Sequence, residues 1–129
     1  MASIILDTGP FVMLLLGSER LTPATRMALS EGDTVFVSAI SFYEIAQKSR
    51  LGKWPDVDDI VPHLVASANT GNIGVLPITA DLALNAANLD WAHRDPFDRI
   101  IAATALSENM TCVSSDRAFD DVGVVRIRP

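Results

Sequence analysis

Short apolar runs alternate with longer helical segments along the whole chain, and this alternation constrains the fold more than any other feature. Strands are predicted at residues 4–6, 34–37, 75–78, 112–114 and 124–127. Helices are predicted at residues 10–16, 39–51, 58–68, 79–91 and 95–107, and one more begins at Thr22-Pro23 and is closed by Gly32. Strands separated by helices indicate an α/β fold in which a parallel sheet is covered on both faces.

Length and composition limit the organisation of the chain. Its 129 residues predict one domain, residues 1–129, and a hydrophobic fraction of 49% predicts a well-filled core. No apolar run approaches the roughly 20 residues that cross a bilayer, and no cleavable signal segment is visible, so we expect a cytoplasmic protein without membrane contact. The net charge of -6 argues against a protein that coats nucleic acid with its whole surface, so any phosphate binding must be local.

Four acidic residues occupy informative positions in this pattern. Asp7 ends the first apolar run, Glu44 lies inside a predicted helix, Asp98 belongs to the run His-Arg-Asp-Pro-Phe-Asp-Arg, and Asp116 follows the fourth strand. α/β proteins place their chemistry outside the carboxyl ends of parallel strands. If the fold brings these carboxylates together, they form a site for a hard cation, and an all-oxygen set suits Mg²⁺ or Mn²⁺.

The first two acids also have simple structural explanations. Asp7 and Thr8 are both preferred residues for capping the helix that follows. Ser41 and Glu44 have the Ser-x-x-Glu spacing of a capping box, which would explain Glu44 without any function. The spacing of the sequence leaves both interpretations open.

The other two acids also have structural explanations when taken singly, although the setting of Asp98 is the most specific of the four. Asp95 followed by Pro96 is a typical helix start, and Asp98 falls one turn later, where a carboxylate favours the positive end of the helix. Asp116 follows two serines and fits an ordinary turn. Four separate structural explanations must therefore hold together for the chain to be chemically inert.

Taken in order, these motifs resemble a PIN domain, and the similarity extends over essentially the whole chain. They are most similar to the toxins of prokaryotic VapBC toxin–antitoxin pairs, and residues 93–99 are the most specific part of the match. The resemblance implies a three-layer α/β/α sandwich, a divalent-metal-dependent ribonuclease, homodimerisation and inhibition by a small VapB-type antitoxin. It assigns catalysis and metal binding to four acids, Asp7, Glu44, Asp98 and Asp116, with support from Thr8, Ser114 and the helix cap Asp95.

The resemblance also implies where RNA and antitoxin bind. Basic residues near the acids would guide the RNA backbone, namely Lys48, Arg50, Lys53 and Arg99, although a solvated helix face is the simpler explanation for any one of them. Apolar side chains would anchor an amphipathic antitoxin segment, namely Phe42, Leu51 and Trp54.

Two other classes of protein compete with this expectation. A phosphatase of the haloacid-dehalogenase kind also uses an aspartate at a strand end, but it needs a second aspartate two positions later, where this chain has Gly9. A non-catalytic PIN-like interaction domain is the other alternative. The complete set of four acids argues against it.

Overall fold

A five-stranded parallel sheet forms the centre of the protein. The computed structural model describes residues 3–17, 19–30 and 34–129. Its strands are β1 (Ser3–Leu6), β2 (Thr34–Ser38), β3 (Gly74–Leu76), β4 (Thr111–Val113) and β5 (Arg126–Ile127). They lie in the order β3-β2-β1-β4-β5, and all neighbouring pairs are parallel. The predicted α/β fold with a parallel sheet is confirmed.

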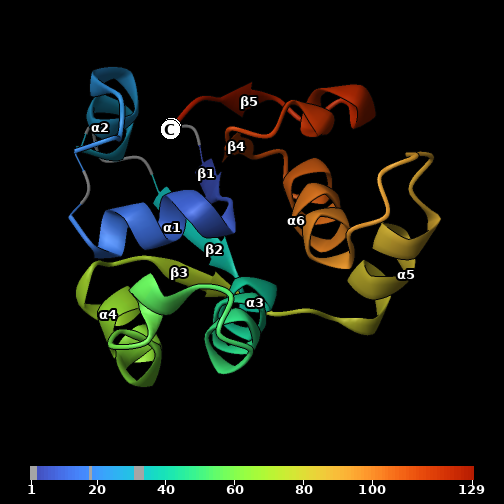
Figure 1. Cartoon of the computed structure of the whole chain (residues 1–129). Coiled ribbons are helices and arrows are strands. Elements are labelled where there is room, and N and C mark those ends of the chain that lie inside the picture. The colour runs from blue at the N-terminus through green and yellow to red at the C-terminus, as the bar shows by residue number, and fades with distance from the viewer. Residues whose placement is uncertain (1–2, 18, 31–33) are drawn as a thin grey trace.

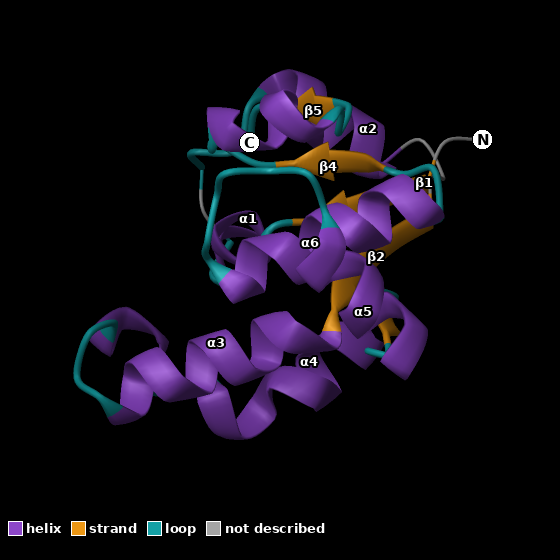
Figure 2. Ribbon diagram, turned by 90° about the vertical axis from the view of Figure 1, so that its right-hand side faces the viewer, coloured by secondary structure: helices purple, strands orange, loops and turns teal. Residues whose placement is uncertain are grey.

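Helices cover both faces of this sheet. The α-helices are α1 (Thr8–Leu15), α2 (Pro23–Ser30), α3 (Ala39–Arg50), α4 (Leu64–Thr70), α5 (Ala80–Asn88) and α6 (Pro96–Ser107), and three short 3-10 helices are η1 (Pro55–Val57), η2 (Val61–His63) and η3 (Arg117–Val122). Figure 1 shows α1, α2 and α4 on one side of the strands and α5 and α6 on the other. In Figure 2, α5 lies beside α6.

Alternation of side chains along β1 produces these layers. Ile4 and Leu6 are buried in one core cluster, whereas Ile5 is buried in a second cluster together with Ile101 of α6. Successive side chains on a strand point to opposite faces, so an apolar strand can supply both cores. Burying one such side chain contributes about 1.5–3 kcal/mol, so a polar substitution at Ile5 would disrupt the packing of α6.

The strand register brings several chain segments to one edge of the sheet. Leu6 pairs with Val37 on one side and with Val113 on the other. The three strands therefore end within one residue of each other at the same edge of the sheet, and the amide of Asp7 donates a 3.0 Å hydrogen bond to the carbonyl of Val113. This carboxyl edge of the sheet is where the candidate functional residues lie.

Some predicted boundaries differ from the structure. Residues 58–68, predicted as one helix, form η2 and then α4, because Pro62 has no amide hydrogen to donate and interrupts a regular helical ladder. Helix α5 ends at Asn88 rather than near residue 91, and η3 was not predicted. Gly32, expected to close the second helix, lies outside the described residues. No described helix has both the length and the apolar character needed to cross a membrane.

Candidate acidic active site

Asp7 both caps α1 and faces the site. Its Oδ1 accepts a 2.8 Å hydrogen bond from the amide of Thr8, and its Oδ2 accepts a 2.7 Å hydrogen bond from the hydroxyl of Ser114. Burial raises the pKa of Asp7, although these two hydrogen bonds oppose the change. Its structural role as a cap and a role in binding a cation are therefore compatible.

Glu44 is a buried carboxylate, with only 7% of its surface exposed. The capping-box explanation is wrong, because α3 is capped by Ser38, whose hydroxyl accepts the amide of Ile40 at 3.1 Å. Instead, Oε1 of Glu44 accepts a 2.6 Å hydrogen bond from Thr8, and Oε2 accepts one of 2.6 Å from Lys48. These partners fix the carboxylate in place.

Asp98 lies in the first turn of α6. Asp95 is the cap of this helix, as predicted, because its Oδ1 accepts the amides of Phe97 at 2.8 Å and Asp98 at 3.4 Å. The carboxylate of Asp98 is therefore not needed for the cap, and its Oδ2 lies 2.6 Å from Nε2 of His93. Burial raises the pKa of Asp98 to about 6, despite the hydrogen bond from His93.

Ser114 connects the remaining acid to Asp7. Its hydroxyl accepts a 3.0 Å hydrogen bond from the amide of Asp116 while donating to Asp7. Asp116 also caps η3, since its Oδ1 accepts the amide of Ala118 at 2.9 Å. The turn predicted around Asp116 is thus present, and it holds the carboxylate beside the carboxyl end of β1.

The four predicted acids lie at the same edge of the sheet. Asp7, Glu44 and Asp98 line one hollow of about 430 Å³. Asp98, Asp116 and His93 can each offer one ligand atom, and these three atoms lie within 4.8 Å of one another. Carboxylate oxygens and an imidazole nitrogen at this spacing fit a single divalent cation. His93 was not among the predicted ligands, although it stands in the motif that carries Asp98.

Arg99 stabilises the loop that contains His93. Its five N–H groups donate to five backbone carbonyls at 2.7–3.1 Å, those of Ala86, Ala87, Leu89, Trp91 and His93. A guanidinium has five N–H donors, so none is left for a phosphate. Arg99 therefore joins the end of α5 to the start of α6, and the predicted role of Arg99 in binding RNA does not fit these contacts.

Comparison with known protein families identifies the family of this chain. A family model described as PIN domain matches residues 4–125. The chain belongs to the PIN domain family. No match was found among curated proteins.

Solved structures share the fold of this PIN domain. The toxin VapC20 of Mycobacterium tuberculosis, described as cleaving the sarcin-ricin loop, is 23% identical, with a TM-score of 0.67 and coverage of 98% of this chain and 100% of that one. FitAcB from Neisseria gonorrhoeae is 20% identical, with a TM-score of 0.67 and coverage of 98% and 97%. DNA-bound VapBC from Salmonella typhimurium is 18% identical, with a TM-score of 0.66 and coverage of 99% and 98%.

Basic and apolar side chains border the acidic hollow of this PIN domain. Lys48 and Lys53 line it together with Trp54, and Nζ of Lys48 lies 5.9 Å from the centroid of the Trp54 ring. Arg50 is exposed at the end of α3, and Leu51 exposes 49% of its surface. The hollow thus combines a negative floor with positive charge and one aromatic face at its rim.

Phe42 is only partly accessible to a partner. Its ring is half-buried, packs against the core and lies 5.5 Å from the ring of Phe11. Trp54 is also half-buried and packs against the same core while it lines the hollow, so Leu51 is the only fully exposed side chain of the three predicted anchors.

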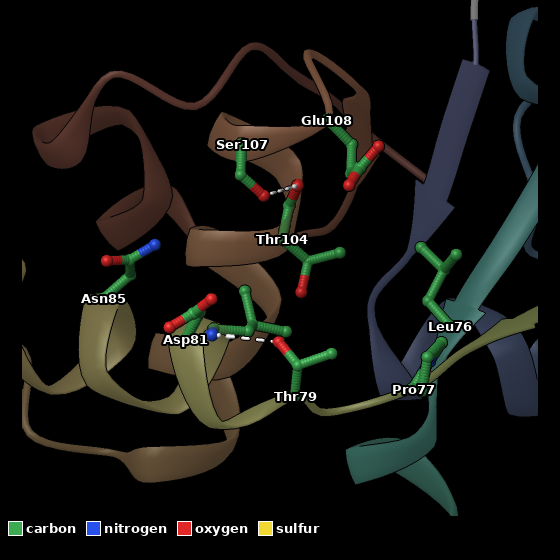
Figure 3. A pocket seen from close by; sticks show the side chains of 9 residues that line it. Leu76, Pro77, Thr79, Asp81, Asn85, Thr104, Ser107 and Glu108 are labelled. Atoms are coloured by element: carbon green, nitrogen blue, oxygen red, sulfur yellow. Dashed lines mark hydrogen bonds between the residues drawn. The ribbon is translucent and has the colours of Figure 1, made fainter.

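A second hollow of about 280 Å³ lies away from these residues, between α5 and α6. Figure 3 shows Asp81 and Asn85 on α5 facing Thr104 and Glu108 on and after α6. None of the site residues predicted from the sequence lines it. This hollow is therefore separate from the acidic one at the carboxyl edge of the sheet.

Proposed function

We propose that this PIN domain is a metal-dependent endoribonuclease that hydrolyses RNA phosphodiester bonds. The observation that carries the proposal is the convergence of Asp7, Glu44, Asp98 and Asp116 at one edge of the sheet. These acids come from four separate segments of the chain, and helix capping alone does not require them to meet. Membership of the PIN domain family supports a nuclease activity.

The four acids would contribute to a Mg²⁺ or Mn²⁺ site in two different ways. Asp98 and Asp116 lie closest to a common point and would bind it directly. Asp7 is oriented toward the same region by Ser114, and Glu44 by Thr8, so these two would complete the ligand set directly or through water. The ion supplies an activated water and neutralises charge on the phosphate when it is bound.

RNA would reach the acids past the basic rim of the hollow. Lys48, Arg50 and Lys53 offer positive charge for the phosphate backbone, which an acidic protein must bind locally. Trp54 offers an aromatic face on which an unpaired base could stack. Its contact with Lys48 holds both groups at the entrance.

The same domain would act as the toxin of a type II toxin–antitoxin pair. Support comes from the fold shared with VapC20 of Mycobacterium tuberculosis, which is described as a toxin. We infer that a VapB-type antitoxin binds beside the hollow and uses Leu51, Trp54 and the accessible part of Phe42 as apolar anchors. Homodimerisation stays a prediction, which light scattering after size-exclusion chromatography would test.

Cleavage of RNA by acid variants tests the nuclease proposal. We expect Asp98→Asn and Asp116→Asn each to abolish metal-dependent cleavage of a mixed RNA substrate without preventing folding. Asp59→Asn is the matched control, because this carboxylate is exposed and lies outside the acidic hollow. Retention of wild-type cleavage in both site variants would refute the proposal.

A further inference from the structure

His93 places a nitrogen atom among the carboxylates. Its Nε2 lies 2.6 Å from Oδ2 of Asp98, and its ligand atom lies within 4.8 Å of those of both Asp98 and Asp116. This is the only group of three or more such ligands found among the described residues. It contains a donor of a different chemical type from the four predicted acids.

The imidazole is held in this position by its surroundings. Its ring lies 4.8 Å from the ring of Trp91, which is anchored by a 3.1 Å hydrogen bond from its indole N–H to the carbonyl of Ala118. Arg99 fixes the backbone on both sides by donating to the carbonyls of Trp91 and His93 at 2.9 and 2.8 Å. These contacts fix the position of the imidazole beside Asp98.

The contact between His93 and Asp98 is a hydrogen bond, which needs one proton between the two atoms. The lone pair of an imidazole nitrogen and a carboxylate oxygen repel each other at 2.6 Å unless a proton lies between them. A divalent cation held by Asp98 and Asp116 would accept the lone pair of Nε2 once this proton has left. The imidazole would then change from a hydrogen-bond donor into a ligand.

We propose that His93 is a nitrogen ligand of the divalent metal centre, together with Asp98 and Asp116. This inference rests on the metal site of the proposed function and adds a ligand to it. Imidazole nitrogen favours transition metals, whereas Mg²⁺ prefers oxygen ligands. His93 therefore biases the centre toward Mn²⁺ over Mg²⁺.

Electron paramagnetic resonance of Mn²⁺ tests this ligand without RNA or turnover. In wild-type protein, electron spin echo spectra should show coupling of the bound Mn²⁺ to an imidazole ¹⁴N nucleus. His93→Asn should remove this coupling and raise the Kd for Mn²⁺ by at least about tenfold, while the Kd for Mg²⁺ changes less. His63→Asn is the matched control, because His63 is the only other histidine and is exposed, and it should behave as wild type.

The outcomes of these measurements test the role of His93 independently of the proposed nuclease activity. Bound Mn²⁺ without ¹⁴N coupling, or an equal change in both affinities, would overturn the assignment of His93 even if RNA is cleaved. Coupling that disappears only in the His93 variant would support it even if no RNA is cleaved. Failure of wild type to bind Mn²⁺ would overturn the inference as well. If His93→Asn does not fold by circular dichroism, His93→Gln provides the same comparison.

Discussion

The hydroxyl of Thr8 donates a 2.6 Å hydrogen bond to Oε1 of Glu44, 36 positions further along the chain. Thr8 begins α1 and Glu44 lies in α3, so this contact ties together two helices that leave neighbouring strands of the sheet. Both residues are buried. The bond therefore satisfies a buried carboxylate and fixes its direction at the edge of the acidic hollow.

Removal of the Thr8 hydroxyl should reduce both stability and cleavage. Thr8→Val keeps the shape of the side chain but leaves Glu44 without one partner, which we expect to cost about 1–3 kcal/mol of unfolding free energy. Thr8→Ser retains the donor and should restore cleavage to near the wild-type rate. Urea denaturation and RNA cleavage of the two variants provide the measurement. Equal behaviour of the valine and serine variants would contradict this role.

The sequence contains enough information to predict the edge at which the acids meet. Asp7 and Asp116 each follow an apolar strand, and the carboxyl ends of parallel strands lie at one edge of a sheet. Asp95 was predicted correctly as a cap because Asp-Pro is a strong local signal for a helix start. These successes depend on short-range patterns and on one general property of parallel sheets.

Long-range contacts explain what the sequence could not predict. Ser41 has capping-box spacing to Glu44, yet the helix begins earlier, and the hydroxyl of Ser41 contacts Thr8 at 2.8 Å. Arg99 was expected to contact RNA because it is a basic residue next to an acid, but it binds backbone carbonyls of a loop that precedes it. Nothing in the local sequence specifies the path of that loop.

Asp98 should make the stability of the metal-free protein depend on pH. Its pKa is raised from 3.8 to about 6, so the folded state binds more protons than the unfolded state between these values. The free energy of unfolding must therefore fall as pH rises through this window, by at most about 3 kcal/mol. The raised pKa of His93, caused mainly by its hydrogen bond to Asp98, extends the fall above pH 6.5.

Thermal melting in excess EDTA from pH 4 to pH 8 checks this prediction. Asp98→Asn should flatten the decline, because it removes the raised carboxyl and the main cause of the shift at His93. Saturating Mn²⁺ should flatten it in wild type as well, since a bound cation keeps the carboxylate ionised. A steeper decline in Asp98→Asn than in wild type would be incompatible with the burial of this acid.

Arg99→Lys should loosen the segment between α5 and α6. A lysine has three N–H donors and no planar fork, so it cannot reproduce the five hydrogen bonds to backbone carbonyls. We expect a decrease of about 2 kcal/mol or more in the free energy of unfolding and faster hydrogen exchange in residues 89–95. Arg94→Lys is the control because Arg94 is exposed in the same loop. Exchange that is equally slow in both variants would show that other contacts hold the loop.

Replacement of the basic rim should weaken RNA binding while leaving metal binding nearly unchanged. The double variant Arg50→Gln with Lys53→Gln removes two exposed positive charges and leaves all four acids in place. Lys48→Gln is kept separate, because Lys48 also holds Oε2 of Glu44 at 2.6 Å. We expect the double variant to flatten the salt dependence of binding by about 0.7 for each phosphate of single-stranded RNA that it no longer neutralises.

Cleavage kinetics distinguish weakened RNA binding from damage to the acidic site. The double variant should cleave slowly at low RNA concentration and recover as RNA is raised, because its acids are intact. Lys48→Gln should show the same weakened binding together with a lower maximal rate, since Glu44 then loses a partner that neutralises its charge. Binding titrations at several salt concentrations, with metal in excess, provide the comparison. An unchanged salt slope in the double variant would place the RNA path elsewhere, with Arg94 and Arg117 as the next basic residues to test.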